Sequence, residues 1–235
     1  MSWAQLDRRS VPDQVFSVLC EEILTNRYQP GEKLPTQRQL ASDFSVNIAS
    51  VREAIMRLQQ LGLVEVRQGD STRVNDWRKN GGLDVIAHAL LRAGTLDQEV
   101  LINVLEARTV LLTESARMAA SRRSGEQATR LCSLAERMQS EADDAAAQSI
   151  DFAFMEEMIE ASGNLVFVLI MNSIRELYLQ GAVMFRAIVA ARQELVPYYW
   201  QIAIAIADET PDEAAAAALT LADRQMQQIL GLLKA

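Results

Sequence analysis

Residues 15–74 read VFSVLCEEILTNRYQPGEKLPTQRQLASDFSVNIASVREAIMRLQQLGLVEVRQGDSTRV, and this stretch decides the fold of the first third of the chain. Apolar residues at helical spacing, such as Val15, Leu19 and Ile23, predict an amphipathic helix at its start. A Pro30-Gly31 turn follows, and then come two short helices, an apolar strand and a glycine turn. Two helices joined by a tight turn and closed by a β-hairpin form a winged helix-turn-helix, a layout that places one helix in the major groove of DNA.

The two short helices carry clear boundary signals. A capping box, in which Thr36 is followed three residues later by Gln39, predicts the start of the first. Asn47 is a good N-cap for the second, which we predict over residues 48–61, with Gly62 ending it. A recognition helix meets base edges near its N-terminal end, so we expect DNA contacts there. The residues at that end are Asn47, Ile48, Ala49, Ser50 and Arg52.

The residues after this helix predict the wing. Residues 63–67 alternate apolar and polar side chains as a half-buried strand does, residues 68–71 form a turn, and residues 72–74 return as a second strand. The first third of the chain therefore closes with a small β-hairpin.

Charge is unevenly distributed along the chain, whose formal net charge is −8 at pH 7. Residues 1–76 carry 9 Lys and Arg against 10 Asp and Glu, and residues 77–235 carry 14 against 21. This balance argues against nonspecific binding of nucleic acid and predicts modest affinity that needs paired half-sites. The surface facing DNA can still be locally positive, because arginines gather in and near the predicted reading elements. They are Arg38, Arg52, Arg57, Arg67 and Arg73.

The pattern PGEKLPTQRQLA followed by VREAIMRLQQLGLVEVRQGDSTRV resembles the DNA-binding domain of the GntR family of bacterial transcription regulators. The resemblance implies that Arg38 and Arg52 contact DNA phosphates or bases, and that the wing tip at Gln68 and Gly69 also touches DNA.

One position departs from the family pattern. The family usually has Ser or Thr, then Arg, then Thr before the VRE element, whereas this chain has Asn47-Ile48-Ala49. A bidentate arginine–guanine contact contributes about 1–3 kcal/mol of discrimination, so we expect an operator that differs from the common family sites. Ile48 could cover a thymine methyl group or pack against the wing, and the sequence leaves both open.

Beyond residue 82 the sequence shows helical periodicity and no convincing strand. Capping signals mark several helix starts, namely Thr95 with Gln98, Ser124 with Gln127, and Thr210-Pro211 with Glu213. The predicted helices cover residues 83–93, 97–122, 125–143, 148–162, 164–191, 194–208 and 211–233. We therefore predict an antiparallel bundle of about seven helices, in which the apolar run 165–171 is buried on all sides.

The predicted protein is mainly α, and it has two domains. Residues 1–75 form a winged helix-turn-helix with a small β-hairpin wing, residues 76–82 form a connector, and residues 83–235 form an all-α antiparallel bundle for effector binding and dimerisation.

The domain order, the length and short fragments resemble the FadR subfamily of GntR regulators. The fragments are Glu106-Ala107-Arg108, Ser162-Gly163-Asn164 and the connector STRVNDW…GGLDVI, the last similar to the fatty-acid-responsive members. The resemblance implies an effector-binding bundle, a homodimer and a near-palindromic operator on double-stranded DNA.

Many members of this subfamily bind a metal through one aspartate and three histidines. Asp151 matches the aspartate, but Met155 stands one helical turn later where a histidine is usual, and Tyr199 and Asp223 stand near the other two positions. The chain has one histidine, His88, so three imidazoles cannot be supplied. A thioether is also a poor partner for a hard divalent ion. We expect no metal and no other cofactor.

A bundle without a metal site resembles those subfamily members that bind acyl-coenzyme A. We therefore expect a fatty acyl-coenzyme A as the effector first, and a small organic acid second. The candidate contacts are Arg108, Asp151, Met155, Tyr178, Tyr199 and Asp223. Arg108 lies among apolar neighbours, where an unpaired arginine is costly. It could also pair with Glu106 or a carboxylate near Glu114. The tyrosines line the pocket or belong to the plain core.

Other classes of protein are poorly supported by the sequence. No nucleophile–base pair, metal motif or phosphate loop points to an enzyme. The longest apolar run, residues 165–171, is far shorter than a membrane span, and the start of the chain lacks a signal peptide. Cys20 and Cys132 lie at apolar-periodic positions, which favours a reducing compartment, and we expect a cytoplasmic protein without a membrane partner. The rival interpretation is an effector sensor whose DNA specificity is lost or altered at Ile48.

Overall fold

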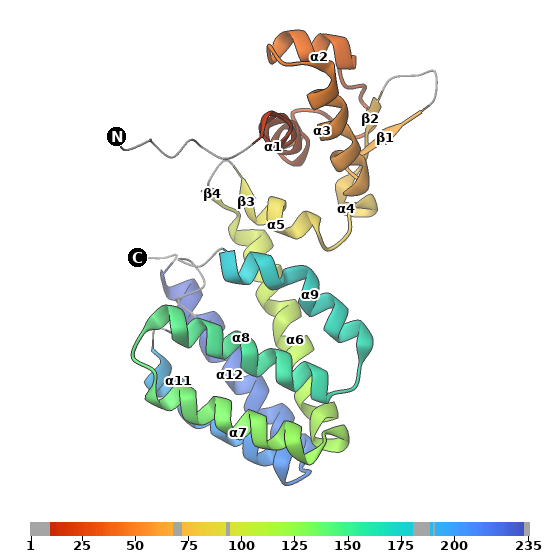
Figure 1. The fold of residues 1–235 in the computed structure, drawn as a ribbon. Helices are drawn as coiled ribbons and strands as arrows, with labels where there is room; N and C mark the ends of the chain where they lie inside the picture. Colours follow the sequence, from red (N-terminus) through yellow and green to blue (C-terminus); the bar gives the residue numbers. More distant parts are fainter. Residues whose placement is uncertain (1–9, 68–71, 93–94, 181–188, 190, 233–235) are drawn as a thin grey trace, which may run out of the picture. The chain divides into compact units, whose positions relative to one another are not determined.

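A computed structural model describes residues 10–67, 72–92, 95–180, 189 and 191–232 of the 235-residue chain. The chain divides into two compact units, Met1–Val100 and Leu101–Ala235, which we call the N-terminal unit and the C-terminal unit. Figure 1 shows the order of their helices and strands. The fold is mainly helical with small antiparallel hairpins, and the predicted fold class is confirmed.

The N-terminal unit begins with three helices, α1 (Val11–Leu24), α2 (Gln37–Asp43) and α3 (Ile48–Gln60). The predicted capping box of α2 is confirmed, because the Thr36 hydroxyl accepts from the Gln39 N–H and the Gln39 side chain accepts from the Thr36 N–H. Asn47 caps α3 as predicted, since its Oδ1 accepts from the Ser50 N–H at 2.8 Å. These local bonds fix where the two helices begin.

Gly62 ends α3 with a backbone φ of +73°, a conformation that favours glycine. The next helix, α4 (Trp77–Asn80), approaches it so closely that a Cβ added at Gly62 would lie 2.2 Å from the backbone oxygen of Asn80. Glycine at this position therefore permits both the turn and the approach of α4.

The wing is an antiparallel hairpin of β1 (Val64–Val66) and β2 (Thr72–Val74), in which Val64 pairs with Val74 and Val66 with Thr72. Its tip, including Gln68 and Gly69, lies outside the described residues. A further bridge joins Lys33 to Arg73. The hairpin is thus attached to the segment that leads into α2.

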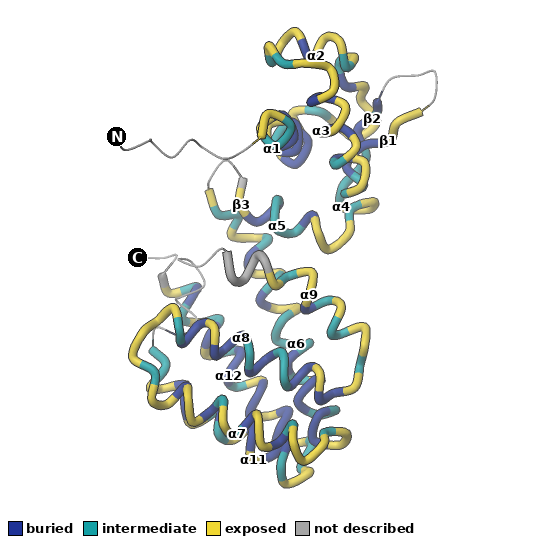
Figure 2. Tube along the Cα trace, in the orientation of Figure 1, coloured by how far each residue is buried: buried dark blue, intermediate teal, exposed yellow. Residues whose placement is uncertain are grey.

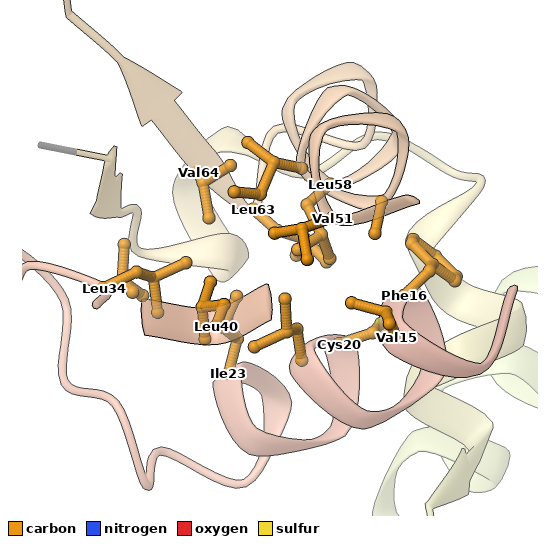
Figure 3. Close-up of a cluster of buried hydrophobic side chains, with 14 of the residues drawn as sticks. Val15, Phe16, Cys20, Ile23, Leu34, Leu40, Val51, Leu58, Leu63 and Val64 are labelled. Carbon is orange, nitrogen blue, oxygen red and sulfur yellow. The ribbon is translucent and has the colours of Figure 1, made fainter. Parts of the chain in front are cut away.

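One apolar cluster holds the N-terminal unit together, and Figure 3 shows its side chains from α1, α2, α3 and β1 pointing toward one another. The short helix α5 (Val85–Leu90) adds Val85 and Ala89 to the same cluster. The ring of His88 meets Phe16 edge-on, with 5.2 Å between the ring centroids. The segment after the wing therefore packs with the winged helix, and α4 occupies most of residues 76–82, where we placed a connector.

A two-strand hairpin, β3 (Leu91–Arg92) with β4 (Thr95–Leu96), lies where no strand was predicted. The expected capping box at Thr95 is wrong, because Thr95 belongs to β4. Asp97 lies directly before α6 instead, and its Oδ1 accepts from the Val100 N–H at 3.0 Å. The Asp97 side chain thus caps the start of α6 in place of the expected Thr95–Gln98 pair.

The C-terminal unit is built from six described helices, most of them bounded near the predicted residues. They are α6 (Gln98–Arg122), α7 (Gly125–Ser140), α8 (Asp144–Ala161), α9 (Leu165–Gln180), α11 (Arg192–Ala207) and α12 (Pro211–Leu232). The Ser124–Gln127 capping box of α7 and the start of α12 at Pro211 are confirmed. Helix α11 packs against both α7 and α12, and α8 packs against α7 and α9. Figure 2 shows buried residues recurring along most of these helices between exposed ones.

The expectation that residues 165–171 are buried on all sides is wrong. Leu165 is 69% exposed, Val166 61% and Leu169 55%, whereas Met171 is buried. An unbroken apolar run has no periodicity that would identify a buried side. In the structure, only one side of α9 packs against the bundle. None of the helices in the described ranges is long and apolar enough to cross a bilayer.

Candidate nucleic-acid interface and effector site

The N-terminal end of α3 offers some of the predicted DNA contacts to solvent and uses others for folding. Asn47 is occupied as the helix cap, and Ser50 is buried. Ile48 is 40% exposed, and Ala49 and Arg52 are also exposed. The exposed side chains at this end are therefore the Asn47 amide, whose Oδ1 caps the helix, one branched apolar group, one methyl group and one guanidinium.

The described arginines in and near the predicted reading elements differ in their partners. Arg38 on α2 and Arg52 on α3 are exposed, and neither has an ion-pair or hydrogen-bond partner among the residues that the structure describes. Arg67 pairs with Glu65 at 2.9 Å, and Arg73 donates to the Gly31 carbonyl at 3.0 Å. Arg38 and Arg52, which match the DNA-contact positions, thus have no described partner, whereas Arg67 and Arg73 do.

Arg57 lies on the same helix as Arg52, but its side chain contacts α1 of the same unit. Its guanidinium pairs with Asp13 of α1 and lies over the Phe16 ring, 4.4 Å from the centroid. The pKa of Asp13 is lowered to about 2, first by the hydrogen bond from the Ser10 hydroxyl and then by the one from Arg57. Through its contacts with Asp13 and Phe16, Arg57 therefore links α3 to α1.

His88 lies in the same region. Burial beside Phe16 and the nearby Arg57 charge lower the pKa of its imidazole.

Four helices of the C-terminal unit bring polar side chains together in its core, and we call these residues the polar cluster. They are Arg108 on α6, Asp151 and Met155 on α8, Tyr199 on α11 and Gln225 on α12. Asp151 and Gln225 have no exposed surface, Tyr199 is 1% exposed and Met155 3%. Such groups are buried at a cost unless they satisfy one another.

Hydrogen bonds connect the polar cluster from helix to helix. The Tyr199 hydroxyl donates to Asp151 Oδ1, and Gln225 Nε2 donates to the same oxygen at 3.0 Å. Gln225 Nε2 also lies 3.0 Å from the Tyr199 hydroxyl oxygen. On its other side, Gln225 Oε1 accepts from Arg108 Nη2 at 2.7 Å. The amide of Gln225 thus links the guanidinium to the carboxyl group.

Arg108 is half-buried and has no carboxylate partner among the described residues. Its Nη2 contacts Gln225 and lies 3.2 Å from Met155 Sδ. The alternative that it pairs with a carboxylate on its own helix finds no support, because Glu106 is exposed and Glu114 faces Arg117 at 3.5 Å. A guanidinium has five N–H donors in a planar fork, so several remain available for an anionic group.

The structure thus brings together four of the predicted effector residues, Arg108, Asp151, Met155 and Tyr199. Asp223 is only half-buried and makes no described hydrogen bond to them, and the side chain of Tyr178 lies outside the described residues.

Gln225 was missed by the sequence analysis. Its signal was present, because it lies four residues from Leu221 and from Ile229, both of them buried apolar positions of α12. A glutamine in the middle of such a stripe indicates a polar group in the core.

A winged helix followed by a helical bundle with a polar core defines a two-domain transcription regulator. The sequence signature of the bacterial regulatory proteins of the gntR family matches residues 12–74, and that of the FCD domain matches residues 103–224. The chain therefore belongs to the GntR family of transcription regulators and carries an effector-binding FCD domain, and it is not an enzyme.

Named relatives cover different shares of the chain. The regulator Mce2R of Mycobacterium tuberculosis is 35% identical over 233 residues, 98% of this chain and 97% of its own. A fatty acid metabolism regulator of Cronobacter sakazakii is 31% identical over 164 residues, 68% of this chain and 66% of its own.

Solved structures share the fold. Lar of Listeria monocytogenes aligns over 97% of this chain and 100% of its own with a TM-score of 0.62 and 19% identity. McbR/YncC of E. coli aligns over 96% of this chain and 99% of its own with a TM-score of 0.51 and 16% identity.

Proposed function

We propose that this regulator binds a near-palindromic operator as a homodimer and that a small acidic metabolite, bound in the C-terminal unit, controls its affinity for DNA. The first effector to test is a long-chain fatty acyl-coenzyme A, and a small organic acid is the second. The observation that carries the proposal is the Arg108 guanidinium, which lies in the bundle beside polar groups and without a described carboxylate partner. Such a group binds carboxylate or phosphate through paired hydrogen bonds.

The choice of acyl-coenzyme A is supported by relatives whose printed name is fatty acid metabolism regulator. The small-acid alternative is supported by Arg108 alone, since a guanidinium recognises any carboxylate. Both effectors carry negative charge, so both predict that removing the Arg108 charge weakens the response.

The DNA half of the proposal rests on the end of α3. Arg38 and Arg52 are exposed and uncommitted, so they can contact phosphates or bases. Ile48, 40% exposed at the first turn, supplies an apolar surface for a thymine methyl group where the family commonly places an arginine. An operator with thymine rather than guanine at that position follows from this contact. Two such winged helices in a dimer require two DNA half-sites that lie one turn of the DNA helix, or a multiple of it, apart.

Fluorescence anisotropy with DNA from upstream of the protein's own gene tests the DNA half. We expect Arg52→Ala to weaken binding about tenfold, the loss expected for one charged contact. Arg27→Ala serves as the matched control, because Arg27 is an exposed arginine outside α2 and α3 that pairs with Glu22 at 2.6 Å. If both variants bind like the wild type, or if no DNA is bound even at low salt, this half of the proposal fails.

The same assay with added long-chain acyl-coenzyme A, or with a short dicarboxylate, tests effector control. We expect Arg108→Met to bind DNA normally and to need at least about tenfold more effector for the same response, the loss expected for a charge-assisted hydrogen bond. Arg137→Met is the control, since Arg137 is exposed on α7. An Arg108→Met variant that responds like the wild type would remove Arg108 from the effector site. If neither compound changes DNA binding, both effector classes are excluded.

A further inference from the structure

The FadR-like regulators that this chain resembles often hold a metal ion between one aspartate and three histidines, so the fit of such an ion can be tested on the polar cluster. Asp151 is present, and the groups that surround it are the Tyr199 phenol, the Gln225 amide and, one turn along α8, the Met155 thioether. No three histidine, cysteine, aspartate or glutamate side chains within the described ranges are grouped to hold a metal. A single carboxyl group with a phenol, an amide and a thioether does not fit a divalent ion.

Several polar atoms of the cluster also already bond to one another. Asp151 Oδ1 accepts from both the Tyr199 hydroxyl and the Gln225 amide. The amide oxygen of Gln225 accepts from Arg108. A metal ion at Asp151 Oδ1 would displace these donors, and it would lie near a guanidinium whose positive charge opposes it.

We infer that the hydrogen bonds among Asp151, Tyr199 and Gln225 take the place of a metal centre and join α8, α11 and α12 as metal ligands would. Each of the three side chains comes from a different helix, and each is at most 1% exposed. Gln225 is the central member because it contacts Asp151, Tyr199 and Arg108 at once. Because these side chains are almost fully buried, losing one member leaves the others without partners, which is the costly case.

Metal titration of the chelator-stripped full-length protein is the first arm of the test. We expect the wild type and Asp151→Asn to bind zinc and manganese equally, so that no metal binding depends on Asp151. We also expect Tm to change by less than about 1 °C when a chelator is added. The Asp151→Asn comparison is needed because Cys132 is half-buried and can bind zinc adventitiously. One tightly bound equivalent of either metal that Asp151→Asn removes would overturn the inference.

The second arm measures the hydrogen bonds themselves, and it requires neither DNA nor an effector. We expect Gln225→Met to lower Tm by about 4 °C, because the substitution keeps the volume and removes the amide. Gln227→Met, at an exposed position of the same helix, is the control and should leave Tm unchanged. We expect Tyr199→Phe combined with Gln225→Met to lower Tm by less than the sum of the single changes, since both act on Asp151. Additive losses, or no loss from Gln225→Met, would show that the cluster does not join the helices.

The third arm rebuilds the missing ligands. The variant Met155→His/Tyr199→His/Gln225→His places three imidazoles around Asp151, and we expect it to bind one equivalent of zinc and to gain at least about 4 °C in Tm from zinc. If this variant folds and binds no zinc, these positions do not surround a common point and the inference fails. If it does not fold, the first two arms decide the matter with single substitutions.

Discussion

The cores of the two units differ in the polar side chains that they bury. The core of the N-terminal unit is an apolar cluster, and its buried polar residues, Ser50 and Thr72, lie at its margin with 7% and 8% of their surface exposed. The core of the C-terminal unit contains Asp151 and Gln225 with no exposed surface. Apolar side chains packed together hold the N-terminal unit, whereas in the C-terminal unit the buried polar side chains must also satisfy one another's hydrogen bonds. The two units therefore differ in whether hydrogen bonds between helices contribute to the core.

The largest effect that tests this comparison is expected in the apolar core. Leu58→Ala on α3 removes a side chain with no exposed surface, and we expect it to lower the free energy of unfolding of the N-terminal unit by about 2–5 kcal/mol. Chemical denaturation followed by tryptophan fluorescence measures the loss, and DNA binding should fall with it. Met56→Ala, on the same helix but 55% exposed, is the control with an expected change below about 0.5 kcal/mol. Equal effects at the two positions would contradict an apolar core as the main source of stability.

A somewhat smaller effect is expected where the backbone itself is constrained. Gly62→Ala combines a positive φ with a Cβ only 2.2 Å from the Asn80 oxygen, so we expect a loss of about 1–3 kcal/mol in the same denaturation assay. Gly82→Ala is the matched control, because a Cβ there meets nothing within 4 Å. If Gly62→Ala is as stable as Gly82→Ala, the contact between α4 and the end of α3 is not constrained as the structure indicates.

The two units also differ in how far their sequences predict them. The boundaries of α2 and α3 depend on residues three apart, such as Thr36 with Gln39 and Asn47 with Ser50, and such local bonds can be predicted from sequence. In the polar cluster, Gln225 meets Asp151 across 74 positions and Arg108 across 117. Contacts over such separations depend on how the helices pack, so periodicity and spacing do not determine them.

The errors in the sequence prediction have related causes. The apolar run of α9 was expected to be buried, yet Leu165 is 69% exposed, because composition alone does not say which face meets a neighbour. Asp223 stays a predicted effector contact, whereas Gln225, two residues on, faces the core and was not among the candidates. Choosing between them requires the phase of α12 relative to the bundle, which the buried positions Leu221 and Ile229 supply.

The smallest effect concerns the charges around the apolar core rather than the core itself. The pKa of Asp13 is lowered to about 2 in the folded protein, chiefly by the Ser10 hydroxyl and then by Arg57, against an ordinary value of 3.8. Because the folded-state pKa is the lower one, the charged form of Asp13 stabilises the fold above about pH 4, and this contribution is lost as the pH falls toward 2. Asp13→Asn should therefore be less stable than the wild type at pH 6, and the difference should shrink steadily between pH 4 and pH 3 in urea denaturation. A difference that stays constant over this range would mean that Asp13 acts through its hydrogen bonds as a helix cap and not through its charge, which would leave the apolar cluster as the main link between α1 and α3.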